Sequence, residues 1–318
     1  MGIFGATLNQ MAFLFSFILL GYLLSKRKLI PDNAQATLSK LENYLFIPAL
    51  VLGTFIDNFT VATLSTAWQL LLSSLILGGI MIAISIPAVR LCSKSKYERN
   101  IFLYGLVFSN FGFMGNAVVS ALFPDVFLEY IIFTLPLWTL IYLWGVPVLL
   151  MGDDSQKMTL GQRLKSFLNP MFICMIVGMV IGLTGITLPT FVTSAVSTAG
   201  SCMSPVAMLL TGMTLANSKL CQIVRIKSVY LVSVIRLVLY PALFLGVGLL
   251  AKYTGWFTFQ ETFYICALCS LSMPLGLNTI VIPSAYGKDT KVASGMALIS
   301  HLLGCITIPI VFALYQML

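Results

Sequence analysis

The segment Leu271–Asn278 places a proline, a glycine and an amide in the middle of an apolar stretch long enough to cross a membrane. Proline removes a backbone N–H donor and clashes with the carbonyl one turn back, and glycine weakens the following turn. Because lipid cannot satisfy the freed backbone groups, a broken helix is tolerated only where protein or a water-filled cavity receives it. Many secondary transporters build binding sites from such helices, and a purely structural kink is the alternative.

A second break is predicted at the corresponding place in the first half of the chain, at Ser109–Asn116, which contains two glycines and two asparagines. An acidic turn follows each break, at Asp125 and at Asp289. These echoes predict two related halves, residues 1–150 and 167–318, joined by a loop at 151–166.

The composition sets the class, because 59% of the residues are hydrophobic and 9% are charged, against about 25% charged in an ordinary soluble domain. A helix needs about 20 apolar residues to cross the hydrocarbon core. We therefore predict an all-α polytopic membrane protein. Its ten expected transmembrane helices lie at 6–25, 36–56, 64–90, 100–122, 128–150, 167–184, 190–215, 228–250, 261–284 and 293–315.

The basic residues alternate between the loops, and short cytoplasmic loops carry Lys and Arg in excess. The loops on one predicted side, counted together with their flanks, hold 16 of the 18 Lys and Arg residues. The loops on the opposite side hold only Lys252. Both termini are therefore predicted outside. With five spans in each half, the second half enters the membrane from the opposite face, which predicts inverted repeats.

Several other classes of protein lack support in the sequence. The basic residues are scattered over short loops, so we expect contact with anionic lipid and no nucleic acid. Cys266 and Cys269 have metal-like spacing, but the chain has no second such pair and one histidine, so we predict no metal site. The sequence contains no phosphate loop, nucleophile elbow or intramembrane aspartate pair, and we predict neither an enzyme nor a bound cofactor.

Three asparagines stand beside the predicted breaks. A side-chain amide there can cap freed backbone groups or donate to a ligand oxygen. The N-termini of half-helices also present free N–H groups and positive dipole ends, which favour anions. We predict a carboxylate site, with capping alone as the alternative. The predicted site residues are Asn110, Gly115, Asn116, Pro274, Gly276 and Asn278.

Three charged or titratable residues are further candidates, because polar groups inside spans are costly. Arg236 is interpreted either as a snorkelling side chain that reaches the cytoplasmic headgroups or as a counter-charge for an anionic substrate. His301, near the middle of the last span, is either structural or a proton carrier for coupling. Asp57 lies near the outer surface, where ordinary solvation explains it, and a role in coupling is the alternative.

Four sequence features together carry a resemblance to a known family. They are Asn110–Gly115, Asn169-Pro170 at the start of the sixth span, Pro205 with Thr211-Gly212, and Pro274 with Asn278. On these features the chain resembles the auxin efflux carrier family over nearly its whole length. Ala117 stands where the family commonly has proline, so we expect a softer first break, and the added amide of Asn116 bears on substrate preference.

The resemblance implies two inverted five-helix repeats, as in the related bile acid–sodium symporters. Helices 1, 2, 6 and 7 would form a scaffold and a homodimer surface, and helices 3–5 and 8–10 a moving transport domain in which broken helices 4 and 9 cross. Plant PIN-type auxin carriers have a similar core, and prokaryotic members are usually assigned to malate, malonate or related organic anions. The short loop at 151–166 is similar to the prokaryotic type.

We therefore predict a secondary transporter in the cell membrane that moves a small carboxylate anion, such as malate, malonate or an auxin-like acid, by an elevator-like mechanism. A transporter-like sensor that binds the same ligand without turnover is the alternative. A channel would require a continuous polar pore, whereas the polar residues of this chain cluster at the two breaks.

The charge alternation makes the topology testable. In a background without native cysteines, an impermeant thiol reagent applied to intact cells should modify Gly2→Cys and leave Ser155→Cys unmodified, since the two positions are predicted on opposite sides. Modification of Ser155→Cys alone would overturn the predicted topology.

Overall fold

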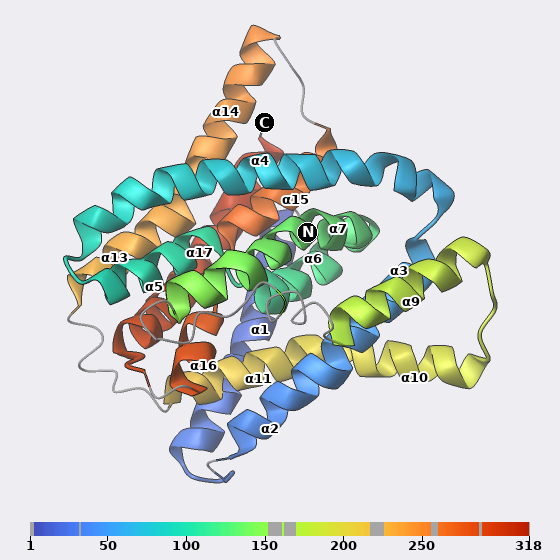
Figure 1. Cartoon of the computed structure of the whole chain (residues 1–318), viewed down its shortest axis with the longest axis horizontal. Coiled ribbons are helices and arrows are strands. Elements are labelled where there is room, and N and C mark those ends of the chain that lie inside the picture. The colour runs from blue at the N-terminus through green and yellow to red at the C-terminus, as the bar shows by residue number, and fades with distance from the viewer. Residues whose placement is uncertain are drawn as a thin grey trace.

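The computed structural model describes residues 3–31, 33–151, 161, 170–216, 226–255, 260–285 and 288–317. Every regular element in these ranges is a helix, and the β-type pairing among them is one isolated bridge (Figure 1). Most of the predicted loop at 151–166, together with Asn169, lies outside the described residues.

The first half of the chain forms the helices α1 (Ile3–Lys26), α2 (Ala34–Leu41), η1 (Glu42–Phe46), α3 (Ile47–Asn58), α4 (Val61–Cys92), α5 (Lys96–Val107), η2 (Phe111–Gly115), α6 (Asn116–Leu122), η3 (Pro124–Val126), α7 (Phe127–Leu140) and η4 (Ile141–Leu150). The second half forms α9 (Pro170–Thr184), α10 (Thr190–Ser201), α11 (Met203–Ala216), α13 (Lys227–Val234), η5 (Ile235–Leu239), α14 (Tyr240–Thr254), α15 (Glu261–Ser272), α16 (Asn278–Ala285) and α17 (Lys291–Gln316).

Six helical stretches in the described residues are long and apolar enough to cross a membrane, and two shorter apolar helices accompany them. The six are Leu8–Lys26, Ala67–Cys92, Pro124–Leu150, Thr190–Ala216, Lys227–Thr254 and Lys291–Gln316, and the shorter two are Pro170–Thr184 and Glu261–Ser272. Large apolar side chains such as Leu19, Ile176 and Ile306 are exposed on their outer faces, as lipid-facing positions require. These features agree with the predicted all-α, multi-pass class.

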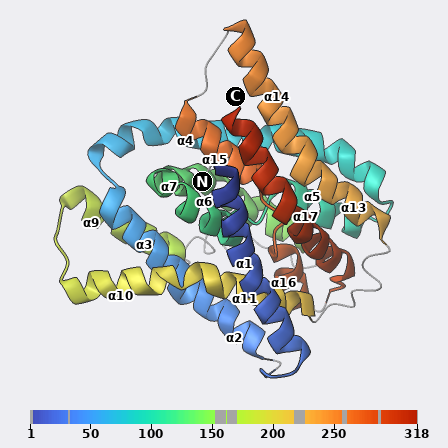
Figure 2. The ribbon, with the colours of Figure 1, turned by 180° about the vertical axis from the view of Figure 1, so that it is seen from behind.

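One group of helices is assembled around α1 and α3. Helix α1 packs along α11, and α3 lies against α9 and α10 (Figures 1 and 2). The α1–α11 contact is close because Gly212 has no side chain: a Cβ there would collide with the Ile18 carbonyl oxygen and lie 2.7 Å from the Tyr22 nitrogen. Small residues of this kind let membrane helices approach backbone to backbone.

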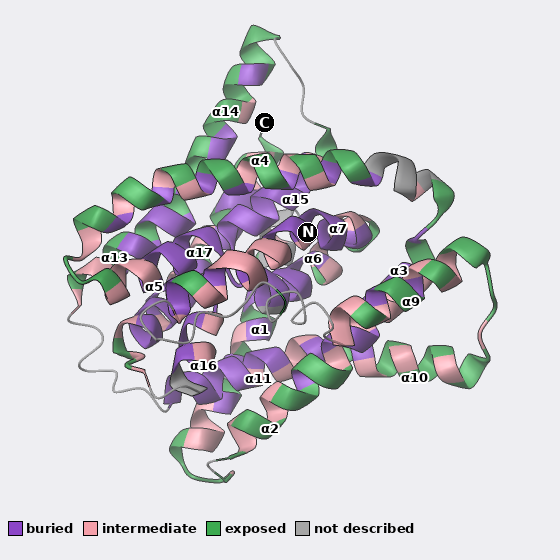
Figure 3. Cartoon of the chain, in the orientation of Figure 1, coloured by how far each residue is buried: buried purple, intermediate pink, exposed green. Residues whose placement is uncertain are grey.

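The most buried residues belong to a second group, formed by α5, α6, α7, α15 and α17 (Figure 3). In α5 the side chains from Ile101 to Val107 are buried, and in α15 those from Tyr264 to Ser272 are. Since protein surrounds these stretches of α5 and α15, they can be followed by breaks that a lipid-facing helix could not contain.

The segments before α5 and α17 are joined to each other. The Tyr97 hydroxyl donates to the Asp289 carbonyl oxygen at 2.8 Å, and the Lys288 ammonium lies over the Tyr97 ring. Partial burial and the nearby Asp289 carboxylate raise the pKa of Tyr97, so its hydroxyl stays a donor at neutral pH. The same lysine donates to the Leu150 carbonyl oxygen, which ties the end of η4 to this group.

The close approach at Gly212 predicts a sharp difference between two glycines. Gly212→Ala should cost about 1–3 kcal/mol, the range for forced overpacking, and lower the melting temperature of the purified protein. Gly246→Ala should be neutral or stabilising, because nothing lies within 4 Å of a Cβ there and alanine favours helix. Equal melting temperatures for the two variants would contradict the packing described.

Candidate functional site

The first predicted break is present between α5 and η2. Helix α5 ends at Val107, residues 108–110 are not helical, and η2 then continues directly into α6. The second break is longer: α15 ends at Ser272, and α16 begins at Asn278. Ala117 lies within α6, after the interruption, and the softer break expected from it stays a prediction.

The two breaks meet and pair with each other. Ser109 and Leu275 form an antiparallel bridge, and the Asn110 N–H donates to the Pro274 carbonyl oxygen at 2.7 Å. A Cβ on Gly276 would lie 2.8 Å from the Phe108 carbonyl oxygen, so this close approach of two backbones requires glycine. We call this paired region, residues 108–110 and 273–277, the crossover.

Arg236 joins the ends of both broken helices. It projects from η5, its side chain is 0% exposed, and its guanidinium donates to carbonyl oxygens on each side of the crossover. Nη1 donates to Leu106 at 2.8 Å, Nε donates to Met273 at 3.3 Å, and Nη2 donates to Ser270. The Tyr240 ring lies 5.7 Å from the guanidinium carbon.

This geometry explains why a charged side chain is buried at this position. The last carbonyls of a helix lack intrahelical donors and carry the negative end of the dipole, so a cation there is stabilising. A single guanidinium supplies five N–H donors in a rigid fork. A side chain with 0% exposure does not fit the snorkelling interpretation, since Arg236 ends among backbone carbonyls of the protein.

His301 and Asn110 form a second contact at the crossover. The His301 Nδ1 atom lies 2.7 Å from the Ala297 carbonyl oxygen, and Nε2 lies 3.0 Å from the Asn110 amide nitrogen. Because a carbonyl oxygen only accepts, Nδ1 carries the proton, and Nε2 accepts from Asn110. The ring is therefore neutral, and a second proton on Nε2 would require the Asn110 amide to turn over.

Ser300, the residue before His301, supports the second break. Its hydroxyl accepts the Leu275 N–H at 3.1 Å, which satisfies one donor that the interrupted helix leaves free. On the other side of the crossover, the Ser109 hydroxyl donates to the Ser270 carbonyl oxygen at 2.9 Å. Both hydroxyls therefore satisfy backbone groups beside the second break, and Ser109 does so from the first break.

A small cavity lies beside the crossover, where the half-helices restart. Its volume is about 20 Å³, room for roughly one water molecule. Asn278 reaches it from the start of α16 and donates to the Tyr104 hydroxyl at 3.2 Å. The lining residues are Tyr104, Phe108, Ser109, Asn110, Phe111, Gly112, Trp138, Ile141, Gly276, Leu277 and Asn278. The first residues of both η2 and α16 thus face one space.

A comparison with family sequences decides the class of this protein. A profile described as Membrane transport protein matches residues 6–312. The chain belongs to this family. The match agrees with the resemblance to auxin efflux carriers, which is thereby confirmed. The family is one of membrane transporters and not of enzymes. A comparison with curated proteins gives no significant match.

In this membrane transport protein the predicted site residues are spread over the crossover and its surroundings. Asn110, Gly276 and Asn278 line the small cavity, and Pro274 pairs with Asn110 through the backbone. Gly115 and Asn116 lie at the junction of η2 and α6, outside the cavity lining. A site shared by Asn116 and Asn278 stays a prediction.

Asp57 lies elsewhere, at the end of α3. It is exposed and lines a separate cavity of about 380 Å³ between α3, α10, α11 and the segment around α6. Ser120, Ser197 and Ser204 line the same cavity. The exposure of Asp57 agrees with the ordinary solvation that the sequence predicts for this carboxylate.

Sequence reasoning missed two aromatic residues that shape the site. Tyr104 holds Asn278, and Trp138 packs edge-on against Phe111 with ring centroids 5.2 Å apart. Trp138 also stacks on Tyr142. Aromatic residues make up 12% of the chain, and no sequence signal distinguished Tyr104 and Trp138 from the others.

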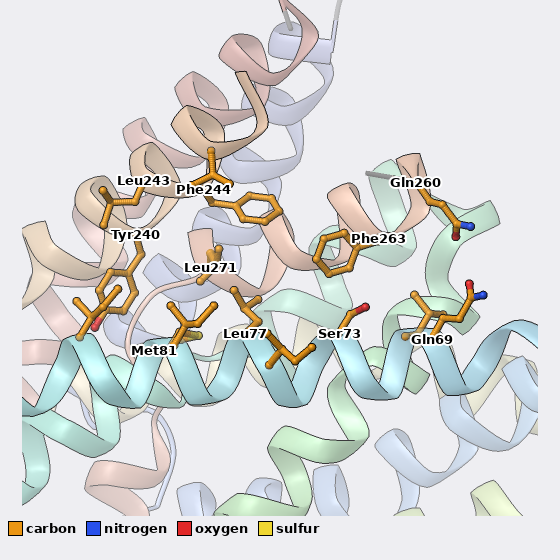
Figure 4. Close-up of a pocket in the computed structure, with 15 residues that line it drawn as sticks. Gln69, Ser73, Leu77, Met81, Tyr240, Leu243, Phe244, Gln260, Phe263 and Leu271 are labelled. Carbon is orange, nitrogen blue, oxygen red and sulfur yellow. The ribbon is translucent and has the colours of Figure 1, made fainter. Parts of the chain in front are cut away.

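Two larger spaces surround the crossover region. One of about 290 Å³ is lined by Trp138 and Tyr142 together with Lys40 and Asn43, so a basic residue faces it. The other, of about 580 Å³, lies between α4, α14 and α15 and is mostly apolar, with Gln69, Ser73 and Gln260 toward one end (Figure 4). The polar space next to Trp138 suits an anion, and the apolar groove does not.

The contacts of Arg236 predict a large effect on stability. Arg236→Met leaves buried carbonyls without a donor, which costs about 1–3 kcal/mol of stability for each carbonyl. We therefore expect the purified variant to unfold at a much lower temperature than the wild type, and Arg236→Lys to unfold at a temperature between those of the wild type and Arg236→Met. Arg90→Met is the matched control, because Arg90 is exposed and such changes stay within about 0.5 kcal/mol. Equal stability of Arg236→Met and Arg90→Met would refute the role of the guanidinium.

Proposed function

We propose that this protein is a secondary transporter of a small organic carboxylate anion. The observation that carries the proposal is that the first residues of η2 and of α16 line one cavity together with the amides of Asn110 and Asn278. Helix N-termini and side-chain amides are donors, and the positive dipole ends favour an anion. The carbonyl ends of the same broken helices are already paired with Arg236, which leaves the donor ends for a ligand.

The conformation described here is closed around this site. A cavity of about 20 Å³ does not accommodate a dicarboxylate, and Trp138 lies between it and the 290 Å³ space that Lys40 faces. We infer that an anion enters through this space, where Lys40 attracts it, and that Trp138 and Tyr142 move aside to admit it.

The movement that we propose is an elevator-like shift of one helix group past the other. The crossover, the Tyr97–Asp289 bond and the Lys288–Leu150 bond tie the elements from α4 to η4 to those from α13 to α17. The other group, α1 to α3 and α9 to α11, is held by helix packing such as the contact at Gly212. A unit joined internally by hydrogen bonds can move as one body.

The same proposal includes ten spans in two inverted repeats, with both termini outside the cell membrane and a homodimer contact on the scaffold helices. The support is that each expected span overlaps one to three consecutive helical elements and that both breaks occur at matching places in the two halves. A sensor with the same ligand and no turnover remains the alternative function.

Uptake into proteoliposomes tests the proposal directly. Proteoliposomes that contain the purified protein should take up more labelled malate, malonate or an indole carboxylic acid than liposomes without protein. Imposed pH, sodium or voltage gradients then reveal the driving ion. Saturable binding of the same acids without uptake would favour the sensor, and neither binding nor uptake of any carboxylate would refute the proposed substrate class.

The site predicts which substitutions weaken binding. If Asn278 donates to a bound carboxylate, Asn278→Ala should cost about 1.5–3 kcal/mol, a ten- to hundredfold rise in Kd measured by titration. Asn278→Asp should lose more affinity, because it places a negative charge beside an anion. Asn116→Ala tests the shared site in the same way.

The matched control is Asn33→Asp, an exposed asparagine before α2, which should leave Kd unaltered. A helix cap alone is worth about 1 kcal/mol of stability. Lower melting temperatures with unchanged Kd in Asn116→Ala and Asn278→Ala would show that these asparagines only cap the breaks.

A further inference from the structure

Glu42, like Arg236, has an ionisable side chain that is buried inside the protein. It opens η1, the π-helical turn between α2 and α3, and it is 0% exposed. Neither carboxyl oxygen has a hydrogen-bond partner. Arg236 is also fully buried and also lies on a π-helical turn, η5, but its guanidinium donates to three carbonyl oxygens. Single π-helical turns inside α-helices occur frequently at functional sites.

The helices packed against η1 are α2, α3, α9, α10 and α11. Their titratable or charged groups, with those of η1 itself and of the α10–α11 junction, are Lys40, Tyr44, Asp57, Cys174 and Cys202. Lys40 is exposed and faces the 290 Å³ space together with Tyr44, and Asp57 lies at the far end of α3. No ion pair between Glu42 and a described residue is present, so no cation in the described part of the chain neutralises this carboxylate.

A carboxylate in this environment has no source of stabilisation. Moving such an ion out of water costs several kcal/mol even after the protein relaxes, and no donor here repays that cost. A hard metal cation would need about six oxygen ligands, and the described residues contain no group of three or more His, Cys, Asp and Glu side chains. A proton needs only the carboxyl group itself.

We propose that Glu42 is a proton-binding site in the scaffold, protonated in this conformation, and that its proton is exchanged during transport. The coupling part of this inference rests on the proposed function; the protonated state does not. The cavity of about 380 Å³ is the hydrated space considered for this exchange: Ala49 and Leu50 line it, and Ala49 is about 10 Å along the helix from Glu42 at 1.5 Å per residue.

Infrared spectroscopy tests the protonated state without any reagent. Purified protein at pH 7 should show the C=O stretch of a protonated carboxylic acid. This band should be lost in Glu42→Gln, so it should appear in the difference spectrum of wild type minus Glu42→Gln. Asp57→Asn is the matched control and should not remove the band, because Asp57 is exposed. Absence of a band that depends on Glu42 would overturn the proposal.

A lipophilic carbodiimide gives a second, residue-specific measurement. The protonated carboxyl adds its O–H across one C=N bond, and the O-acylisourea then rearranges to a stable N-acylurea with no atom lost. Mass spectrometry should find this adduct on Glu42 in proteoliposomes, and raising the pH should reduce it. An adduct on Asp57 with none on Glu42, despite the infrared band, would place the proton site elsewhere.

The coupling is tested by uptake with and without an inward proton gradient. In wild type the gradient should raise uptake severalfold, and in Glu42→Gln the ratio of the two rates should fall to one. In His301→Gln the ratio should stay above one, since His301 is held neutral by Ala297 and Asn110. If the ratio of the two rates falls to one in His301→Gln and stays above one in Glu42→Gln, the coupling belongs to the histidine.

The two proposals can fail separately. If no carboxylate is transported but the Glu42 band is present, the proposed substrate class is wrong and the proton site stands. If carboxylates are transported and the band is absent, the transporter stands and the proton site is wrong.

Discussion

The contact on which the rest of the structure depends is the one between the Arg236 guanidinium and the carbonyl ends of two broken helices. Each interruption frees carbonyl groups at a depth where lipid offers no donor. Two such ends brought together would also place two negative dipole ends side by side. The buried guanidinium donates to the free carbonyls and places a positive charge beside both negative dipole ends, because its donors reach Leu106 on one helix and Ser270 on the other. The crossover can therefore exist inside a membrane.

This contact gives the crossover two chemically different sides. On one side the carbonyl ends of α5 and α15 are occupied by Arg236, and on the other the starts of η2 and α16 line the small cavity with Asn110 and Asn278. His301 fixes the amide of Asn110 by accepting from it, so its donor direction depends on a neutral ring. The small cavity is thus lined largely by backbone dipoles and amides, which is the chemistry that the proposed anion site requires. Glu42 lies away from this site, on the other helix group.

Much of the fold could be predicted from the sequence, because proline, glycine and hydropathy act locally. The positions of both breaks and the family were predicted from residues such as Asn110 and Pro274. The partners of Arg236 could not be predicted, since they come from helices distant in the chain, and a snorkelling arginine has the same local sequence. Tyr104 and Trp138 were missed because no sequence signal distinguishes them from the other aromatic residues of the chain. Glu42 lies inside the expected span 36–56, and only the fold shows that no hydrogen-bond partner among the described residues reaches it.

The central claim is that the helices around the crossover move as one body past the scaffold. Distances between paired spin labels measure this most directly in proteoliposomes, with and without a transported carboxylate. Labels at Ser120 on α6 and Ser197 on α10 face one cavity between the two groups, so their distance distribution should shift with substrate. Labels at Lys94 and Lys291, both exposed within the moving group, should keep theirs. A shift between Lys94 and Lys291 with none between Ser120 and Ser197 would contradict the account.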